Sequence, residues 1–145
     1  MRIRLEAINK ENWYECSQLT VTPAQSHSIS SNLLCIAEVQ FYPTWGAFAI
    51  YADAQMVGFV MYEDDYEQEA WWISSLMISA DQQRKGYGKG AIQALLPLLE
   101  EAGCGEIWVG YADDNLAARN LYQSVGFTEF GLDEDGDMVA HRRLD

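Results

Sequence analysis

Hydrophobic and polar residues repeat along this chain with two different periods, which divide it into strands and helices. Alternating or short apolar runs rich in aromatic and β-branched residues predict seven strands, over residues 2–7, 47–52, 56–62, 70–78, 106–111, 128–132 and 138–143. Apolar residues at helical spacing predict four helices, over residues 9–19, 29–39, 91–102 and 115–125. Within the second helix, Leu33, Ile36 and Ala37 are expected to share one face.

The order of these elements, β-α-α-β-β-β-α-β-α-β-β, predicts the fold class. Antiparallel strands in the middle of the chain are joined by a helical crossover to the later strands. This order indicates an α/β (α+β) fold with a mixed, mostly antiparallel seven-stranded sheet and helices on both faces. A length of 145 residues, of which 49% are hydrophobic, and the lack of an internal repeat suit a single domain over residues 1–145.

The net charge of the chain limits the classes of molecule that we expect it to bind. The chain has 9 Lys and Arg against 22 Asp and Glu, a formal net charge of −13, which disfavours nucleic acid and anionic membranes. It favours a cationic partner, or serves solubility alone. No apolar run approaches the ~20 residues that a membrane span needs, and the N-terminus lacks the apolar centre of a signal peptide. A cytoplasmic protein without a membrane partner is therefore expected.

The cysteines and histidines are dispersed along the chain. Cys16, Cys35 and Cys104 are an odd number with no close pairing, so they indicate neither a disulfide framework nor a zinc site. We expect them to be reduced, with two of them buried. His27 and His141 stand far apart and have no neighbouring ligand pattern. The sequence predicts no metal site.

A short glycine loop has the most specific chemical pattern. The segment Gln83-Arg84-Lys85-Gly86-Tyr87-Gly88 follows the apolar strand that ends at Ile78 and precedes a helical pattern that begins near Lys89. Two glycines let the backbone approach a ligand closely, and successive amides at a helix start attract anions. Arg84, Lys85 and Lys89 place three of the nine basic residues within six positions. The segment suits a phosphate group, and an ordinary solvated turn is the alternative.

The helix over 115–125 brings a polar residue, a small residue and a phenol onto one face. Asn115, Ala118 and Tyr122 stand at positions i, i+3 and i+7. The neighbouring apolar stripe is expected to hold the helix on the sheet and to leave Tyr122 pointing elsewhere; this stripe comprises Ala117, Leu121 and Val125. A tyrosine on a helix usually serves packing, so a catalytic role depends on its surroundings.

Together the two motifs resemble the GNAT acetyltransferase superfamily. Its acetyl-CoA loop reads Gln/Arg-x-x-Gly-x-Gly/Ala and matches residues 83–88, and a second match, Asn-x-x-Ala-x-x-Leu-Tyr-x-x-x-Gly-Phe, covers 115–127. The resemblance implies that acetyl-CoA is the cosubstrate and that Tyr122 is the general acid that protonates the departing thiolate. The cofactor contacts that it implies are Leu76, Met77, Ile78, Gln83, Arg84, Lys85, Gly86, Tyr87, Gly88, Lys89 and Asn115.

Within that superfamily the chain is similar to the spermine/spermidine acetyltransferase group. The similar segments are 41–43, 49–51 and 57–62, and they imply a polyamine acceptor. The run 63–69 places five carboxylates in seven residues. Such a run either meets a polycation or forms a solvated hairpin turn, and the sequence does not decide between these two interpretations.

One position departs from the pattern of that group. Related polyamine enzymes tend to have a carboxylate where this chain has Ser74. Serine alone cannot remove a proton from an amine whose pKa is near 10. We therefore expect that Ser74 and a nearby acid, Glu38 or Glu63, hold a water chain that takes the proton.

Other interpretations compete with this one. Gly86-x-Gly88-x-x-Ala91, with Glu106 twenty residues after Gly86, fits a dinucleotide fingerprint, but Glu106 begins its strand where that motif needs an acid at the end. An acyl-CoA-binding regulatory module would keep the cofactor loop without turnover. A protein amine or an aminoglycoside would also suit an acetyltransferase of this kind as the acceptor of the acetyl group. The oligomeric state is open, and a homodimer is compatible with the sequence.

Overall fold

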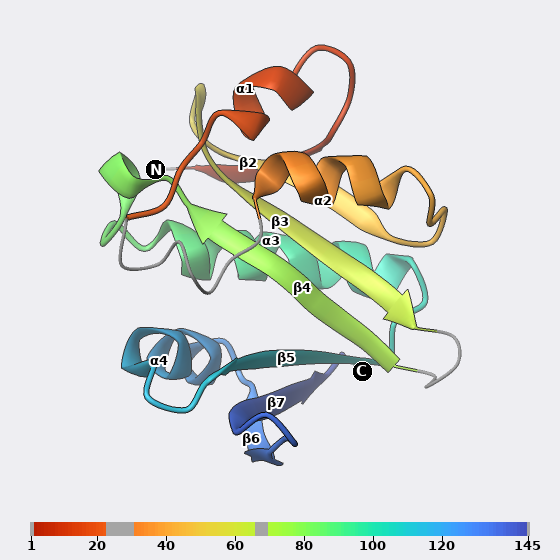
Figure 1. Cartoon of the computed structure of the whole chain (residues 1–145), viewed down its shortest axis with the longest axis vertical. Helices are drawn as coiled ribbons and strands as arrows, with labels where there is room; N and C mark the ends of the chain where they lie inside the picture. Colours follow the sequence, from red (N-terminus) through yellow and green to blue (C-terminus); the bar gives the residue numbers. More distant parts are fainter. Residues whose placement is uncertain (1, 23–30, 66–69, 145) are drawn as a thin grey trace.

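The computed structural model describes residues 2–22, 31–65 and 70–144, and its architecture confirms the predicted fold class. The described strands form one sheet of order β1-β2-β3-β4-β5-β7-β6, in which β4 and β5 are the parallel pair and the other neighbours are antiparallel (Figure 1). The strands are β1 (Ile3–Ala7), β2 (Gly46–Ala52), β3 (Gln55–Asp65), β4 (Ala70–Ile78), β5 (Glu106–Ala112), β6 (Thr128–Leu132) and β7 (Asp137–Arg143).

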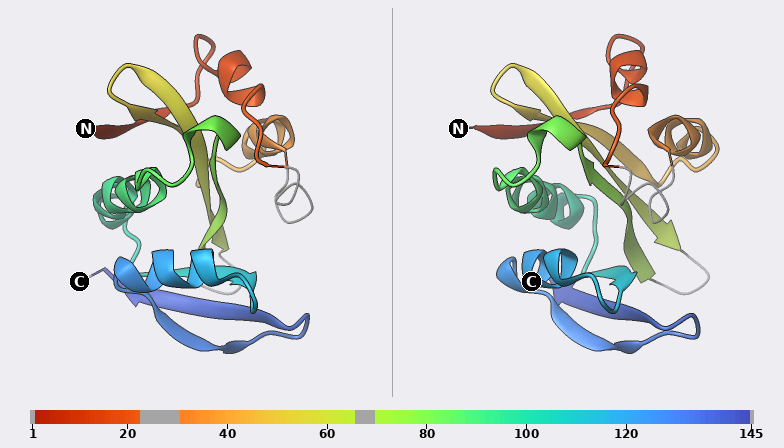
Figure 2. Two further views of the ribbon diagram at one scale, coloured as in Figure 1. Left: turned by 90° about the vertical axis from the view of Figure 1, so that its left-hand side faces the viewer. Right: turned by 60° about the vertical axis from the view of Figure 1, so that its left-hand side comes forward.

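Helices cover both faces of the sheet and enclose a separate core on each (Figure 2). On one face, α1 (Trp13–Ser17) and α2 (Asn32–Val39) pack over a core that includes Phe59 and Met77. On the other face, α3 (Tyr87–Glu101) and α4 (Leu116–Ser124) pack over a core that includes Leu95 and Ile107. The strands between the cores are therefore apolar on both sides, as the runs in 56–62 and 70–78 indicate.

The face of α2 that packs on the sheet differs from the predicted one. Leu33 and Ala37 are exposed and only Ile36 of the predicted trio is buried, so that prediction is wrong. The helix begins at Asn32, whose Nδ2 donates to the backbone oxygen of Cys16 at 2.9 Å. This buried hydrogen bond fixes the rotation of α2 about its axis, a constraint that hydrophobic spacing alone does not reveal.

β4 contains an irregularity at its centre that decides which core each side chain enters. The register with β3 shifts between Met61 and Tyr62, which pair with Ser75 and Ile73, so Ser74 is the extra residue of a bulge. Ile73 packs in the core under α3, whereas Met77 packs in the core under α1 and α2. Residues four apart on a regular strand share a face, so the bulge has reversed the alternation.

Candidate active site

A cleft of about 940 Å³ opens where β4 and β5 separate (Figure 1). The parallel pairing of the two strands ends at Ile73 and Val109. Beyond that point the edge of β4 that faces β5 pairs with no described strand, and Ser74 to Ile78 line the cleft. Backbone N–H and C=O groups away from water need partners, so an extended, amide-containing ligand suits this edge.

The glycine loop forms one end of the cleft. It follows the short helix η2 (Ala80–Gln82), and both Arg84 (φ 65°) and Gly86 (φ 81°) have left-handed backbone conformations, which gather successive N–H groups on one side. α3 begins directly afterwards, at Tyr87. This start is earlier than residue 91, where the apolar pattern predicts that the helix begins. Gln83 Nε2 donates to the Ile78 oxygen at 2.9 Å and ties the loop to the end of β4. Amides and a helix N-terminus together suit phosphate oxygens.

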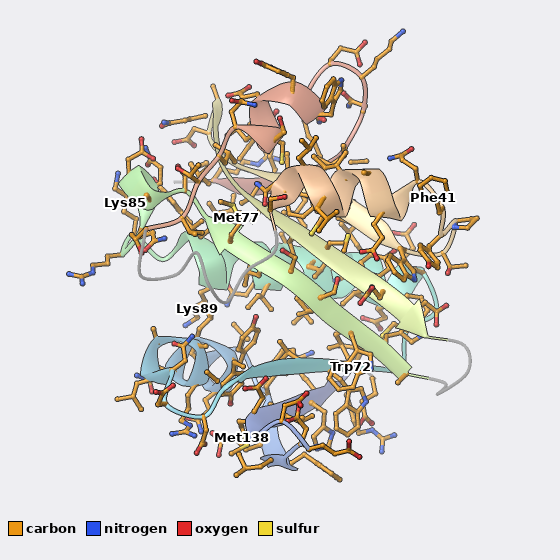
Figure 3. The ribbon with its side chains drawn as sticks, viewed as in Figure 1. Phe41, Trp72, Met77, Lys85, Lys89 and Met138 are labelled. Atoms are coloured by element: carbon orange, nitrogen blue, oxygen red, sulfur yellow. The ribbon has the colours of Figure 1, made fainter. Side chains whose placement is uncertain are left out.

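The structure brings most of the predicted residues to this cleft and leaves three outside its lining. The lining includes Ser74, Leu76, Met77, Ile78, Gln83, Arg84, Gly86, Tyr87, Gly88, Asn115 and Tyr122. Lys85, Lys89 and Glu63 do not line it. Lys85 is exposed at the outer edge of the molecule, where its Nζ donates to Gln82 Oε1 at 3.1 Å (Figure 3). Of the three clustered basic residues, Arg84 is thus the one that lines the cleft.

The strand segment that the family resemblance places beside the pantetheine arm, Ser75 to Ile78, lies at the cleft. Met77 packs in the core under α1 and α2, so its backbone is what faces the cleft. The Ser75 hydroxyl is buried and acts on the Cys35 thiol in the core under α1 and α2, where a hydrogen bond from the serine lowers the pKa of Cys35 against the larger effect of burial.

Tyr122 is buried, which corrects the expectation that it points away from the packed face of its helix. It is 6% exposed, its ring stacks on Tyr111 with the centroids 5.7 Å apart, and it meets Phe127 edge-on. Ala117, expected to pack on the sheet, is exposed instead. Burial, with a smaller contribution from Tyr111, raises the pKa of the Tyr122 phenol above its ordinary value near 10. Tyr122 also lines the cleft, and its phenol makes no hydrogen bond to a described residue.

A hydrogen-bonded network holds the ring that stacks on Tyr122. The Tyr111 hydroxyl donates to Glu129 Oε1 at 3.3 Å, and the same oxygen accepts from Arg119 Nε at 2.6 Å. Arg119 Nη2 also binds Asp113 Oδ1 at 2.9 Å. Because Arg119 and Tyr122 lie on the same helix, the network links α4 to β5 and β6 and fixes the two stacked rings. Sequence spacing does not predict it, since its members come from four separate segments.

Asn115 caps a helix and also lines the cleft. Its Oδ1 accepts from the Ala118 amide at 3.0 Å and caps α4, while the residue also lines the cleft. The remaining lining residues, which sequence reasoning did not propose as ligand contacts, come chiefly from β5, α4 and their flanks: Val21, Ile73, Gln82, Val109, Gly110, Tyr111, Ala112, Asp114, Ala117, Ala118, Leu121 and Asp137.

Metal ligation and membrane insertion find no support within residues 2–22, 31–65 and 70–144. In those ranges no group of three or more His, Cys, Asp or Glu side chains is arranged to hold a metal ion. None of the helices there is long and apolar enough to cross a membrane. His27 lies outside the described residues.

Comparison with known proteins identifies the family. The sequence profile of the acetyltransferase (GNAT) family matches residues 7–127. The spermine/spermidine N(1)-acetyltransferase of Bacillus subtilis (strain 168) is 28% identical over 152 residues, which cover 99% of this chain and 100% of that protein. The ribosomal protein bS18-alanine N-acetyltransferase of Escherichia coli (strain K12) is 33% identical over 57 residues, 39% of this chain and 38% of that one.

Solved structures agree with this fold. A chimeric spermidine N-acetyltransferase from Vibrio cholerae and hSSAT has a TM-score of 0.80 at 18% identity, over 99% of this chain and 96% of that chain. The protein described here is thus an acetyl-CoA-dependent acyltransferase. It belongs to the acetyltransferase (GNAT) family, and the resemblance of its two motifs to that family is confirmed.

Alanine at the two loop glycines should change folding stability in opposite directions. A Cβ at Gly86 would meet no atom within 4 Å, so its cost is that of the left-handed conformation, about 1–2 kcal/mol. A Cβ at Gly88 would touch Leu121 at 3.5 Å, an ordinary contact, and alanine favours a helix over glycine by about 1 kcal/mol. Urea denaturation should therefore show Gly86→Ala less stable than wild type, and Gly88→Ala equally or more stable.

Gly86→Ala should weaken acetyl-CoA binding by at least about fivefold, because the loop amides would approach the phosphates closely. Gly88→Ala should keep its Kd, since the loop pattern also allows alanine at that position. Gly103→Ala is the control for backbone strain, since Gly103 also has a left-handed φ of 100° with open space around it but follows the far end of α3. It should lose stability and keep its Kd for acetyl-CoA. An unchanged Kd for Gly86→Ala would exclude the loop as the phosphate site.

Proposed function

We propose that this enzyme transfers the acetyl group of acetyl-CoA directly to a primary amine, and that the acceptor is a polyamine such as spermidine or spermine. The observation that supports it most is the 28% identity to a spermine/spermidine N(1)-acetyltransferase over 99% of this chain. The net charge of −13 also favours a cationic acceptor over an anionic one.

The cofactor contacts follow the shape of the cleft. The loop amides from Gln83 to Lys89 and the start of α3 would bind the phosphates. The free edge of β4 from Leu76 to Ile78 would pair with the amide groups of the pantetheine arm, and Asn115 would contact the same arm. Acetyl-CoA supplies the thioester on which the reaction depends.

Tyr122 is the proposed acid in a direct transfer. The amine nitrogen forms a bond to the acetyl carbonyl carbon, the carbon–sulfur bond breaks, and Tyr122 gives its proton to the departing sulfur. A covalent route through cysteine is disfavoured, because all three cysteines are buried, one more than expected from the sequence. Burial is the main cause that raises the pKa of Cys16 to about 12 and of Cys104 to about 11, and it also raises that of Cys35. None is a ready thiolate at neutral pH.

Two carboxylates, Glu38 on α2 and Glu63 on β3, are the candidate acids. Burial is the main cause that raises the pKa of Cys35, and the charges of Glu38 and Glu63 raise it further. Glu63 is half-buried on β3 and Glu38 is exposed on α2. Of the acidic run 63–69, residues 66–69 and the side chain of Asp65 lie outside the described residues. Glu38 and Glu63 can attract an ammonium group toward β4.

The proton that leaves the amine needs an acceptor, and Ser74 with Glu63 or Glu38 is the proposed relay. Ser74 lines the cleft, and its hydroxyl donates to the Met61 oxygen at 3.4 Å. We expect Ser74→Ala and Glu63→Gln each to lower kcat/KM for spermidine about tenfold and to alter its pH profile, with the KM for acetyl-CoA unchanged. Glu101→Gln, at the exposed end of α3, is the charge-matched control. Wild-type pH profiles for both variants would remove the relay.

Mass spectrometry of spermidine incubated with acetyl-CoA and enzyme tests the proposed reaction. The expected product carries one acetyl group per molecule of CoA released. Acetylation of an alanine-terminated peptide in place of spermidine would favour a protein amine, an alternative supported by the similarity to the bS18-alanine enzyme over 57 residues. Acetylation of an aminoglycoside alone would favour that acceptor. Binding of acetyl-CoA without acetylation of any amine would favour a regulatory module.

A further inference from the structure

Two tyrosines line the cleft, and their hydroxyl groups have different partners. Tyr111 on β5 and Tyr122 on α4 stack with their ring planes 9° apart. The Tyr111 hydroxyl donates to Glu129 Oε1 at 3.3 Å, whereas the Tyr122 hydroxyl makes no hydrogen bond to a described residue. The packing of its ring and of its helix therefore sets the direction of the Tyr122 hydroxyl, and no hydrogen bond of its own does so.

Arg119 holds the helix that contains Tyr122 from two sides. It lies three residues before Tyr122 on α4, so the two side chains are neighbours on the helix surface. Its Nε donates to Glu129 Oε1 on β6 at 2.6 Å. Its Nη2 donates to Asp113 Oδ1 at 2.9 Å and to the backbone oxygen of Asp113 at 3.1 Å. These contacts run from α4 to β6 and to the turn before α4, so they fix the rotation of the helix about its axis.

The rings around Tyr122 belong to the same hydrogen-bonded network. Phe127 lies two residues before Glu129 and meets the Tyr122 ring edge-on, with the centroids 5.3 Å apart. Glu129 Oε1 accepts from both the Tyr111 hydroxyl and Arg119 Nε. One carboxylate oxygen thus joins the ring that stacks on Tyr122 to the helix that carries Tyr122. The Arg119 and Glu129 side chains are 26% and 30% exposed, and hydrogen bonds between charged groups are stronger than neutral ones.

We propose that Arg119 and Glu129 are positioning residues for acetyl transfer, which hold the Tyr122 hydroxyl where the departing sulfur can take its proton. This inference rests on the proposed role of Tyr122 as the general acid. Proton transfer needs the donor within hydrogen-bond reach, and a displacement of about 1 Å can cost roughly 100-fold in rate. Neither Arg119 nor Glu129 is among the described residues that line the cleft, so both act through Tyr111 and Tyr122.

Substitution of the shared carboxylate tests the proposal. Glu129→Ala removes the acceptor of both hydrogen bonds, so kcat should fall about tenfold, with the KM for acetyl-CoA within about twofold of wild type. Glu129→Gln keeps an oxygen that can accept from Tyr111 and Arg119, and it should recover kcat to within about threefold. Arg119→Lys keeps the charge but lacks the planar fork that reaches Glu129 and Asp113 together, so it should resemble Glu129→Ala.

A double-mutant cycle separates positioning from a purely structural role. If Glu129 acts through the acid, Glu129→Ala should cause no further loss of kcat in a Tyr122→Phe background, within about twofold. Equal losses in both backgrounds, or a wild-type kcat for Glu129→Ala, would overturn the inference and leave Tyr122 as the acid. A wild-type kcat for Tyr122→Phe would instead remove the proposed acid itself.

The controls show that the variants are folded and that the effect belongs to this network. The circular dichroism of each variant and its Kd for acetyl-CoA should match those of wild type. Glu6→Ala breaks an exposed ion pair with Arg4 on β1, outside the residues that line the cleft. It should leave kcat unchanged. An equal loss of kcat in Glu6→Ala and Glu129→Ala would also overturn the inference.

Discussion

Tyr122→Phe should lower kcat for acetyl transfer by roughly 100-fold or more, with the KM for acetyl-CoA nearly unchanged. The substitution removes the only proton of the side chain that a departing thiolate can take, and general acids contribute about 10²–10⁴ in rate. The phenylalanine ring still stacks on Tyr111 and fills the same buried space, so binding and folding should be preserved. Steady-state kinetics with varied acetyl-CoA separates the two effects, because a lost transition-state contact appears in kcat.

Tyr111→Phe is the matched control, since it removes the other hydroxyl of the stacked pair. That hydroxyl is bound to Glu129, so it has no proton ready for the cleft, and its loss should cost less than about tenfold in kcat. The raised pKa of Tyr122 gives a second signature. The phenol of the folded protein keeps its proton at pH values above 10, the ordinary pKa of tyrosine. The wild-type kcat should therefore not fall by pH 10 through deprotonation of Tyr122. Normal turnover by Tyr122→Phe would remove Tyr122 from its proposed role.

Gly58→Ala should be the most destabilising of the substitutions considered, with a loss of about 3 kcal/mol or more. A Cβ at Gly58 would overlap the backbone oxygen of Met77 on the neighbouring strand, and it would also press on Ile78 and Ile50. Backbone atoms of a paired strand cannot rotate away as a side chain can. Relief therefore requires that β3 and β4 move apart, and urea denaturation should report the cost.

The same substitution should disturb the cofactor site, because Met77 and Ile78 border the cleft. We expect the KM for acetyl-CoA to rise even where the protein is fully folded. Gly105→Ala is the control, since a Cβ there would meet no atom within 4 Å, and its stability should stay within about 0.5 kcal/mol of wild type. Equal stability of the two variants would show that β3 and β4 lie farther apart than they do in the structure.

The sequence predicted the fold well because the pattern within each element is local. An apolar run predicts β4 over 70–78 and a hairpin pattern predicts β6 over 128–132, and both strands have those bounds in the structure. The glycine loop and the Asn115 motif also depend on short spacings, and both lie at the cleft. The helix bounds were predicted less well, because they depend on the conformation of the adjoining turns. Gly86 adopts a left-handed conformation that caps α3, so the helix starts before its apolar stripe does.

The parts of the site that sequence reasoning missed depend on contacts between distant segments. The separation of β4 from β5 follows from where their pairing ends, at Ile73 and Val109, and no local pattern encodes that point. The burial of Tyr122 depends on Tyr111, eleven residues earlier on another element. Helical spacing places Tyr122 beside a stripe, but only the packed sheet decides which side of the helix faces the core.

Thiol release from acetyl-CoA across a panel of amines tests the central claim most directly. The panel contains spermidine, spermine, short diamines, a lysine peptide and an aminoglycoside, each with wild type and with Tyr122→Phe. We predict the highest kcat/KM for spermidine or spermine, and loss of that turnover in the variant. Turnover that is higher on the peptide or the aminoglycoside, or that Tyr122→Phe leaves intact, would contradict the account.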